Sequence, residues 1–102
     1  MADPIDEMVN PYMTPALLRA ARAVLGWTRG DLAERCRVSA VAIGDYEKGA
    51  RVPHRVTYDA IAKAIEDAGV EFIGEGSPSG LIVKKPELHH ASPRDQKAAS
   101  GK

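Results

Sequence analysis

The sequence has little cysteine: Cys36 is the single one among 102 residues. One cysteine excludes a disulfide within the chain, which fits a reducing compartment. No apolar run approaches the ~20 residues that a helix needs to cross a membrane. The N-terminus, MADPIDEMVNPYM, also lacks the basic and then apolar order of a secretory signal. These absences predict a cytoplasmic protein without a membrane span.

The motifs of catalysis and of metal or cofactor binding are missing as well. The chain has no glycine-rich phosphate loop, no Cys/His metal set, and no nucleophile with a base at a plausible spacing. His89 and His90 are adjacent, but no second pair of ligands stands at a useful distance from them. We therefore expect no enzyme activity, no cofactor and no metal.

Excess charge of either sign is absent from the whole chain, which has 14 basic and 14 acidic residues. The distribution is uneven, because residues 1–15 carry acids only, whereas residues 16–69 carry nine Lys/Arg against seven Asp/Glu. A small positive excess in the central block permits contact with phosphates without requiring it.

Four helices are predicted from start signals, stop signals and apolar spacing. Thr14 is a hydroxyl cap followed by proline at the first helical position. Thr28 has Asp31 as an acidic partner for a capping box, and Ser39 caps the next helix. With their caps, the expected helices span residues 14–26, 28–37, 39–49 and 56–69.

After Gly69 the period of the sequence changes from helical to alternating. Residues 70–73 and 81–84 read as two strands, and residues 74–80 read as the turn between them. A hairpin of two strands is marginal by itself, so it should lie against the helices or pair with another chain. We expect a mainly α-helical fold with four parts: a flexible acidic arm (1–13), a helical domain (14–69), a β-hairpin (70–85) and a disordered tail (86–102).

The second and third expected helices are short and close together. Ala33 is small where the two helices must approach, and Val38 and Ile43 fill the joint from the other side. This arrangement is typical of a helix-turn-helix, whose second helix lies in the major groove of DNA.

Residues 17–73 resemble the XRE family of phage-repressor-like (Cro/CI-type) DNA-binding domains of bacteria. The matching elements are Leu-Arg-x-x-Arg (18–22), Leu-Gly-Trp-Thr (25–28), Asp-Leu-Ala (31–33), Val-Ser (38–39), Ile43, Tyr46-Glu47-x-Gly49 and Pro53. The resemblance implies a lambda-repressor-like helix-turn-helix domain of four to five helices. It also implies a repressor-like regulator of transcription that binds double-stranded DNA and is associated with the nucleoid when bound.

The resemblance implies a set of DNA-binding residues around the third helix. Arg29 stands where family members often place glutamine against a phosphate, and Lys48 and Arg51 stand in the loop that follows the DNA backbone. The base-facing positions are Ala40, Val41, Gly44 and Asp45. The whole set is Thr28, Arg29, Arg37, Ser39, Ala40, Val41, Gly44, Asp45, Lys48 and Arg51. Arg22 and Glu47 match a pair that forms a structural salt bridge in the family.

Three positions depart from the family pattern. Arg37 stands where many relatives have glycine, and a left-handed backbone there would cost about 1 kcal/mol. Gly44 inside a helix costs about 1 kcal/mol relative to alanine, and Asp45 turns a negative charge toward DNA. Because the reading face has no Arg, Asn or Gln, we expect Ala40 and Val41 to contact thymine methyls, with affinity from phosphates and DNA shape.

A regulator with so few base contacts needs a second half-site, so we expect a homodimer. The expected dimer contacts are the apolar hairpin residues Phe72, Ile73, Leu81 and Val83. The alternative hypothesis is a helix-turn-helix that binds a protein partner, such as RNA polymerase, another regulator or a toxin. Asp45, Gly44 and the neutral overall charge support that alternative.

Overall fold

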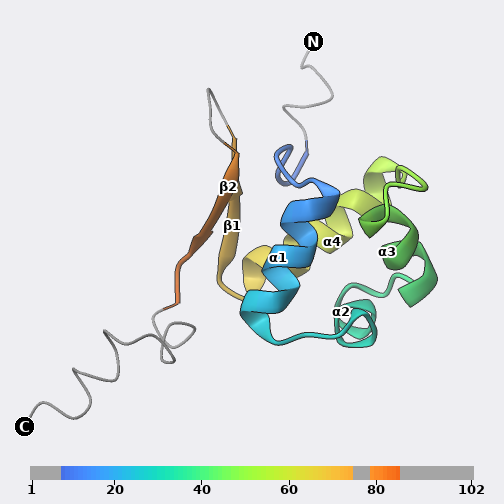
Figure 1. Cartoon of the computed structure of the whole chain (residues 1–102), viewed down its shortest axis with the longest axis horizontal. Helices are drawn as coiled ribbons and strands as arrows, with labels where there is room; N and C mark the ends of the chain where they lie inside the picture. Colours follow the sequence, from blue (N-terminus) through green and yellow to red (C-terminus); the bar gives the residue numbers. More distant parts are fainter. Residues whose placement is uncertain (1–7, 75–78, 86–102) are drawn as a thin grey trace, which may run out of the picture.

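The computed structural model describes residues 8–74 and 79–85, which form four helices followed by an antiparallel hairpin (Figure 1). The elements are α1 (Pro15–Leu25), α2 (Arg29–Cys36), α3 (Ala40–Glu47), α4 (Arg55–Asp67), β1 (Val70–Ile73) and β2 (Gly80–Val83). The predicted fold class is therefore confirmed, and the expected element bounds hold to within a residue or two.

Three of the four helices, α1, α2 and α3, begin at residues whose side chains satisfy a free backbone amide of the first turn. The Thr14 hydroxyl accepts from the N–H of Leu17, and the Ser39 hydroxyl accepts from the N–H of Ala42. Thr28 and Asp31 form a reciprocal capping box, in which each side chain accepts from the backbone N–H of the other. These short-range contacts set where α1, α2 and α3 start.

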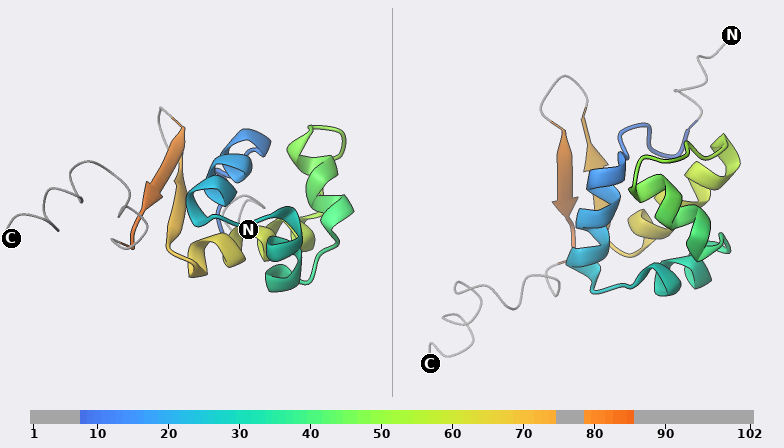
Figure 2. Two further views of the ribbon diagram at one scale, coloured as in Figure 1. Left: turned by 60° about the horizontal axis from the view of Figure 1, so that its bottom comes forward. Right: turned by 45° about the vertical axis from the view of Figure 1, so that its right-hand side comes forward.

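The core lies between the helices and one face of the hairpin. Leu18, Leu32, Ile43 and Ile61 contribute fully buried side chains from the four helices in turn. The hairpin lies across α1 and α4, on the side away from α2 and α3 (Figure 2). The helices thus supply the surface that a two-stranded hairpin needs.

The hairpin register decides which of its apolar side chains are available to a partner. Phe72 pairs with Leu81, and Val70 pairs with Val83, on the inner face. Phe72 is only 1% exposed, and Leu81 packs against the core. The prediction that Phe72 forms a dimer contact is therefore wrong, because the protomer's own core uses this side chain; Leu81 is half-buried on the same inner face. Ile82, which was not predicted, is instead 45% exposed on the outer face.

Residues 8–13, expected to belong to a flexible arm, are packed against the domain. Met13 is buried, and Met8 and Tyr12 pack against the core. Asn10 is 5% exposed, and its amide nitrogen donates to the backbone oxygen of Phe72 (3.0 Å) and to Glu66 Oε2 (2.6 Å). The expectation of a loose arm is wrong for this segment, while residues 1–7 and the predicted tail (86–102) lie outside the described residues.

The hydroxyl groups of two tyrosines bind the backbone of residues 10–13. The Tyr58 hydroxyl accepts from the N–H of Met13 (2.9 Å) and donates to the backbone oxygen of Asn10 (2.6 Å). The Tyr46 hydroxyl donates to the backbone oxygen of Met13 (3.0 Å). Burial raises the pKa of Tyr46 to about 12 and also raises the pKa of Tyr58. Both hydroxyls therefore stay protonated at neutral pH and can donate hydrogen bonds. The segment is thereby fixed to α3, α4 and β1.

Candidate nucleic-acid interface

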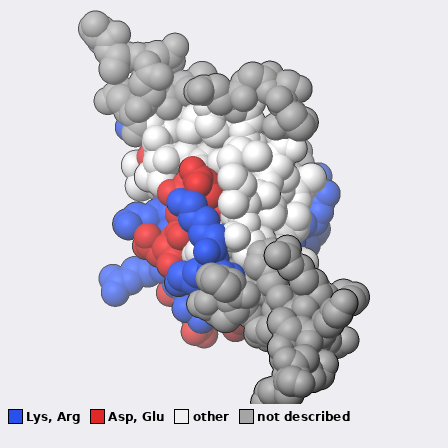
Figure 3. Space-filling view, turned by 90° about the vertical axis from the view of Figure 1, so that its left-hand side faces the viewer, with Lys and Arg blue, Asp and Glu red and all other residues white. Residues whose placement is uncertain are grey.

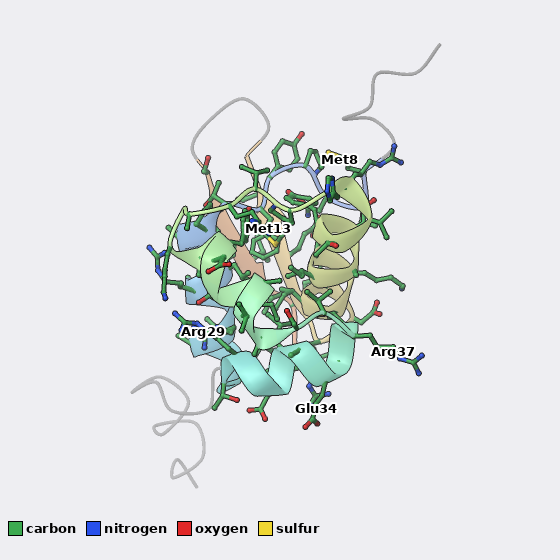
Figure 4. The ribbon with its side chains drawn as sticks, turned by 90° about the vertical axis from the view of Figure 1, so that its right-hand side faces the viewer. Met8, Met13, Arg29, Glu34 and Arg37 are labelled. Carbon is green, nitrogen blue, oxygen red and sulfur yellow. The ribbon has the colours of Figure 1, made fainter. Side chains whose placement is uncertain are left out.

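The turn between α2 and α3 depends on one residue in a left-handed conformation. Arg37 ends α2 with φ 58° and ψ 35°, and its N–H donates to the backbone oxygen of Ala33. A non-glycine residue in the left-handed conformation costs about 1–2 kcal/mol. Arg37 carries this cost because it stands where many relatives have glycine. The Arg37 side chain points into solvent, at the end of α2 away from Arg29 (Figure 4).

Six of the ten predicted DNA-binding residues line one shallow depression of about 300 Å³ on the outer side of α3. Five come from α3 or its C-terminal cap and one comes from the first turn of α2. Val41 is 74% exposed there, so its apolar side chain is available for contact. The six residues are Arg29, Ala40, Val41, Gly44, Asp45 and Lys48.

The other predicted residues lie elsewhere. The hydroxyls of Thr28 and Ser39 cap their helices. Arg51 borders a separate depression of about 180 Å³ in the loop before α4, next to Pro53 and His54. Arg51 therefore lies beyond the C-terminal end of α3, where the resemblance places contacts to the DNA backbone.

The structure alters the prediction for Gly44, which is buried although it was expected to face the bases directly. Arg29 lies across it: a Cβ atom at Gly44 would be 3.7 Å from Arg29 Nη1 and 3.8 Å from Arg29 Cζ. These are ordinary contact distances, so glycine is not required by space alone. At this point of α3, the side chain that faces outward is supplied by α2.

Arg29 is held in place by Glu47, the last residue of α3. The Glu47 side chain is fully buried, and its Oε1 accepts from Arg29 Nε at 3.1 Å. Arg22 Nε donates to Oε2 at 2.7 Å and Arg22 Nη2 donates to Oε1 at 2.9 Å. The Arg22–Glu47 pair named from the resemblance is thus part of a larger cluster that also includes Arg29.

A third arginine reaches the same end of α3. Arg19 Nη1 donates to the backbone oxygen of Glu47, where the helix dipole favours a cation. Arg19 is not among the functional or structural residues predicted from the sequence. Its spacing of three residues from Arg22 places both on one face of α1, and that signal could have identified it.

The electrostatics of the cluster keep Glu47 ionised. Burial by itself would raise the pKa of Glu47, but hydrogen bonds and charges from Arg22 and Arg29 outweigh it, and the pKa lies below its ordinary value. A carboxylate that is fully paired in this way links α1, α2 and α3. The cluster therefore sets the orientation of α3 and of the Arg29 side chain on its surface.

In the part of the chain that the structure describes, no group of three His, Cys, Asp or Glu side chains is placed to hold a metal ion. No helix within residues 8–74 and 79–85 is long and apolar enough to span a membrane.

Comparison with known families agrees with this geometry. A family model described as a helix-turn-helix domain, of the XRE and Cro/CI-like group, matches residues 16–71. The match covers more than half of the chain, and the chain therefore belongs to this family of helix-turn-helix domains. The resemblance drawn from the sequence is confirmed. A comparison with curated proteins gives no match.

Proposed function

We propose that the protein is a sequence-specific, DNA-binding regulator of transcription, non-catalytic and cytoplasmic, which places α3 in the major groove. The observation that carries this proposal is the depression on α3, which gathers six residues of the predicted DNA-binding set on one exposed surface. A helix-turn-helix presents this side of its second helix to the base edges.

The chemistry of the depression suits contact with methyl groups and phosphates. Ala40 and Val41 are exposed and apolar, so they can contact thymine methyls, while the Asp45 carboxylate can accept from cytosine N4. Lys48 is exposed at the C-terminal end of α3, and Arg51 follows in the next loop. Both cations therefore lie at or beyond the C-terminal end of α3, where they can contact phosphates of the DNA backbone.

Replacing Lys48 by alanine is expected to weaken binding to duplex DNA to a similar degree for every sequence. Loss of one phosphate contact should reduce the slope of log K against log salt by about 0.9. Fluorescence anisotropy with a labelled duplex, at several salt concentrations, measures that slope. Lys63→Ala is the matched control, because Lys63 is an exposed lysine of α4 that pairs with Asp67.

The same titration separates DNA binding from the alternative function. If the wild-type protein binds no duplex even at low salt, DNA binding is excluded. A protein partner, such as RNA polymerase, another regulator or a toxin, then becomes the better account of the exposed Val41 and the acidic Asp45. An equal loss of salt slope in Lys48→Ala and Lys63→Ala would show that α3 is not the contact surface.

We also propose that the regulator acts as a homodimer through the outer face of the hairpin. Ile73 and Ile82 are 37% and 45% exposed there. Figure 3 shows a broad area without charged side chains on the side of the molecule where the hairpin lies. Of the contacts predicted from the sequence, Ile73 remains in this proposal, and Ile82 is added; Val83 lies on the inner face with Val70.

Ile82→Lys is expected to shift the dimer toward monomer. Full burial of a side chain of this size is worth about 1.5–3 kcal/mol, and Ile82 is 45% exposed in the protomer, so the loss is about half of that per protomer. Over two protomers it raises the dissociation constant about tenfold or more. Sedimentation velocity over a concentration series measures the shift. Val9→Lys is the control, since Val9 is similarly exposed (43%) but belongs to the N-terminal segment. An unchanged dimer in Ile82→Lys, or a monomeric wild type, would refute this interface.

A further inference from the structure

The reading surface of α3 lacks the side chains that usually form paired hydrogen bonds with bases. Arginine, asparagine and glutamine supply most such contacts, and α3 has the sequence AVAIGDYE. Among the residues that line its depression, the one forked donor is Arg29, which comes from α2. The question is therefore what the Arg29 guanidinium does at that position.

Arg29 takes the place that a side chain of residue 44 would occupy. Gly44 is the fifth residue of α3, and its missing Cβ would lie 3.7 Å from Arg29 Nη1 and 3.8 Å from Arg29 Cδ. The guanidinium thus rests against the middle of the reading helix (Figure 4). Lys48, by comparison, stands at the C-terminal end of the helix, where a phosphate contact is expected.

The hydrogen bonds of Arg29 leave its outer end available. Nε donates to Glu47 Oε1 at 3.1 Å, and the side chain remains 42% exposed. The two Nη groups form the end-on fork that matches two acceptors of a planar partner. In the major groove, guanine N7 and O6 present such a pair of acceptors.

Glu47 holds this fork in one orientation before DNA arrives. Its carboxylate is fully buried and is itself fixed by two hydrogen bonds from Arg22. A side chain already ordered in the free protein loses less conformational entropy on binding. A guanidinium that is fixed in this way suits paired hydrogen bonds to a base edge, which depend on geometry. A phosphate contact needs only charge and gains less from such positioning.

We propose that Arg29 is a specificity-determining residue that reads a guanine, through Nη1 and Nη2, from the gap that Gly44 leaves on α3. The inference rests on the proposed DNA-binding function and deepens it. It replaces the phosphate contact that the family resemblance implied for Arg29. Glu47 acts as the positioning residue for this contact.

The test is a binding selection from a random duplex library with wild type, Arg29→Ala and Lys48→Ala. Wild type should enrich sites with a guanine at one fixed position of each half-site. Arg29→Ala should lose that preference, roughly 5- to 150-fold against the other bases, and keep its preferences elsewhere. Lys48→Ala should bind all sequences more weakly and keep every preference.

Substitutions of Gly44 test the same contact while Arg29 remains. Gly44→Leu should lose the same guanine preference, because its side chain would occupy the position of the guanidinium. Gly44→Ala should keep it, because the added methyl would meet Arg29 at an ordinary contact distance. Circular dichroism melting curves confirm that each variant is folded under the conditions of the selection.

The outcomes separate this inference from the proposed function. If Arg29→Ala weakens binding to all sequences equally, or Gly44→Leu keeps the guanine preference, Arg29 is not a base reader, and DNA binding itself is unaffected. If wild type enriches no site and binds no duplex, the proposed function fails and the role of Arg29 fails with it.

Discussion

Glu47→Gln is expected to lower the free energy of unfolding by about 3 kcal/mol, the lower end of the range for removing one partner of a buried ion pair. The carboxylate is fully buried, and it accepts hydrogen bonds from both Arg22 and Arg29. The neutral amide leaves the guanidinium of Arg22, 18% exposed, without its counter-charge. Arg29 is 42% exposed and can be rehydrated, which keeps the loss from being larger. Urea unfolding at neutral pH measures the change.

Glu34→Gln is the matched control for this experiment. Glu34 is an exposed residue of α2 whose side chain points into solvent (Figure 4). The same chemical change there should alter stability by less than about 0.5 kcal/mol. Equal effects of the two substitutions would contradict the role given to the Glu47 cluster.

The pH dependence of the free energy of unfolding, compared between wild type and Glu47→Gln, gives a second test of the Glu47 cluster. The pKa of Glu47 is lower in the folded protein than its ordinary value, so the unfolded chain binds the proton more readily. Its contribution to stability is therefore complete above the unfolded pKa, about 4.3, and is lost as the pH falls through the folded pKa. The gap between wild type and Glu47→Gln should narrow as urea melts are taken from pH 7 to pH 3. A gap that stays constant over this range would exclude an ionised Glu47 as its cause.

Asn10→Ala is expected to lower the free energy of unfolding by about 2–3 kcal/mol, because buried groups lose their hydrogen-bond partners. The amide nitrogen donates to the backbone oxygen of Phe72 and to Glu66 Oε2, and Oδ1 accepts from the N–H of Tyr12. One side chain thus joins the N-terminal segment to both β1 and α4. Thermal and urea unfolding measure the loss.

Hydrogen exchange locates the effect of Asn10→Ala within the fold. The amides of β1 and β2 should lose protection more than those of α2 and α3, because the lost contacts involve β1 and the end of α4. Val9→Ala is the control, since Val9 is 43% exposed and binds Asp59 through its backbone N–H, which the substitution keeps. A loss of less than 0.5 kcal/mol in Asn10→Ala would mean that the segment is not held by this side chain.

The helices were predictable because their signals are local. The Thr28–Asp31 capping box and the Ser39 cap involve residues three apart in the chain. The spacing of apolar residues in α4 and their alternation in β1 likewise indicate the buried face from residues that are close together in the sequence. The left-handed turn at Arg37 could be anticipated from the family resemblance, because many relatives have glycine at that position.

The sequence predicted the exposure of some of the proposed DNA-binding residues, but not the way in which others are covered. The exposed surface of α3 and its C-terminal cap carries Ala40, Val41 and Lys48, as the helix-turn-helix resemblance predicts. Gly44 does not face outward freely, because Arg29 covers it. A helical periodicity assigns faces to residues of one helix, but it carries no information on a long side chain that crosses from another helix.

The helices of the helix-turn-helix and their caps follow from the amino-acid sequence, because each depends on residues within about four positions of one another. Contacts between distant residues follow only from the tertiary structure. Arg29 and Glu47 are 18 positions apart, and Asn10 and Phe72 are 62 apart. Such contacts exist only once the core has brought the elements together, so the fixed guanidinium over Gly44 and the docked N-terminal segment could be found only in the folded chain.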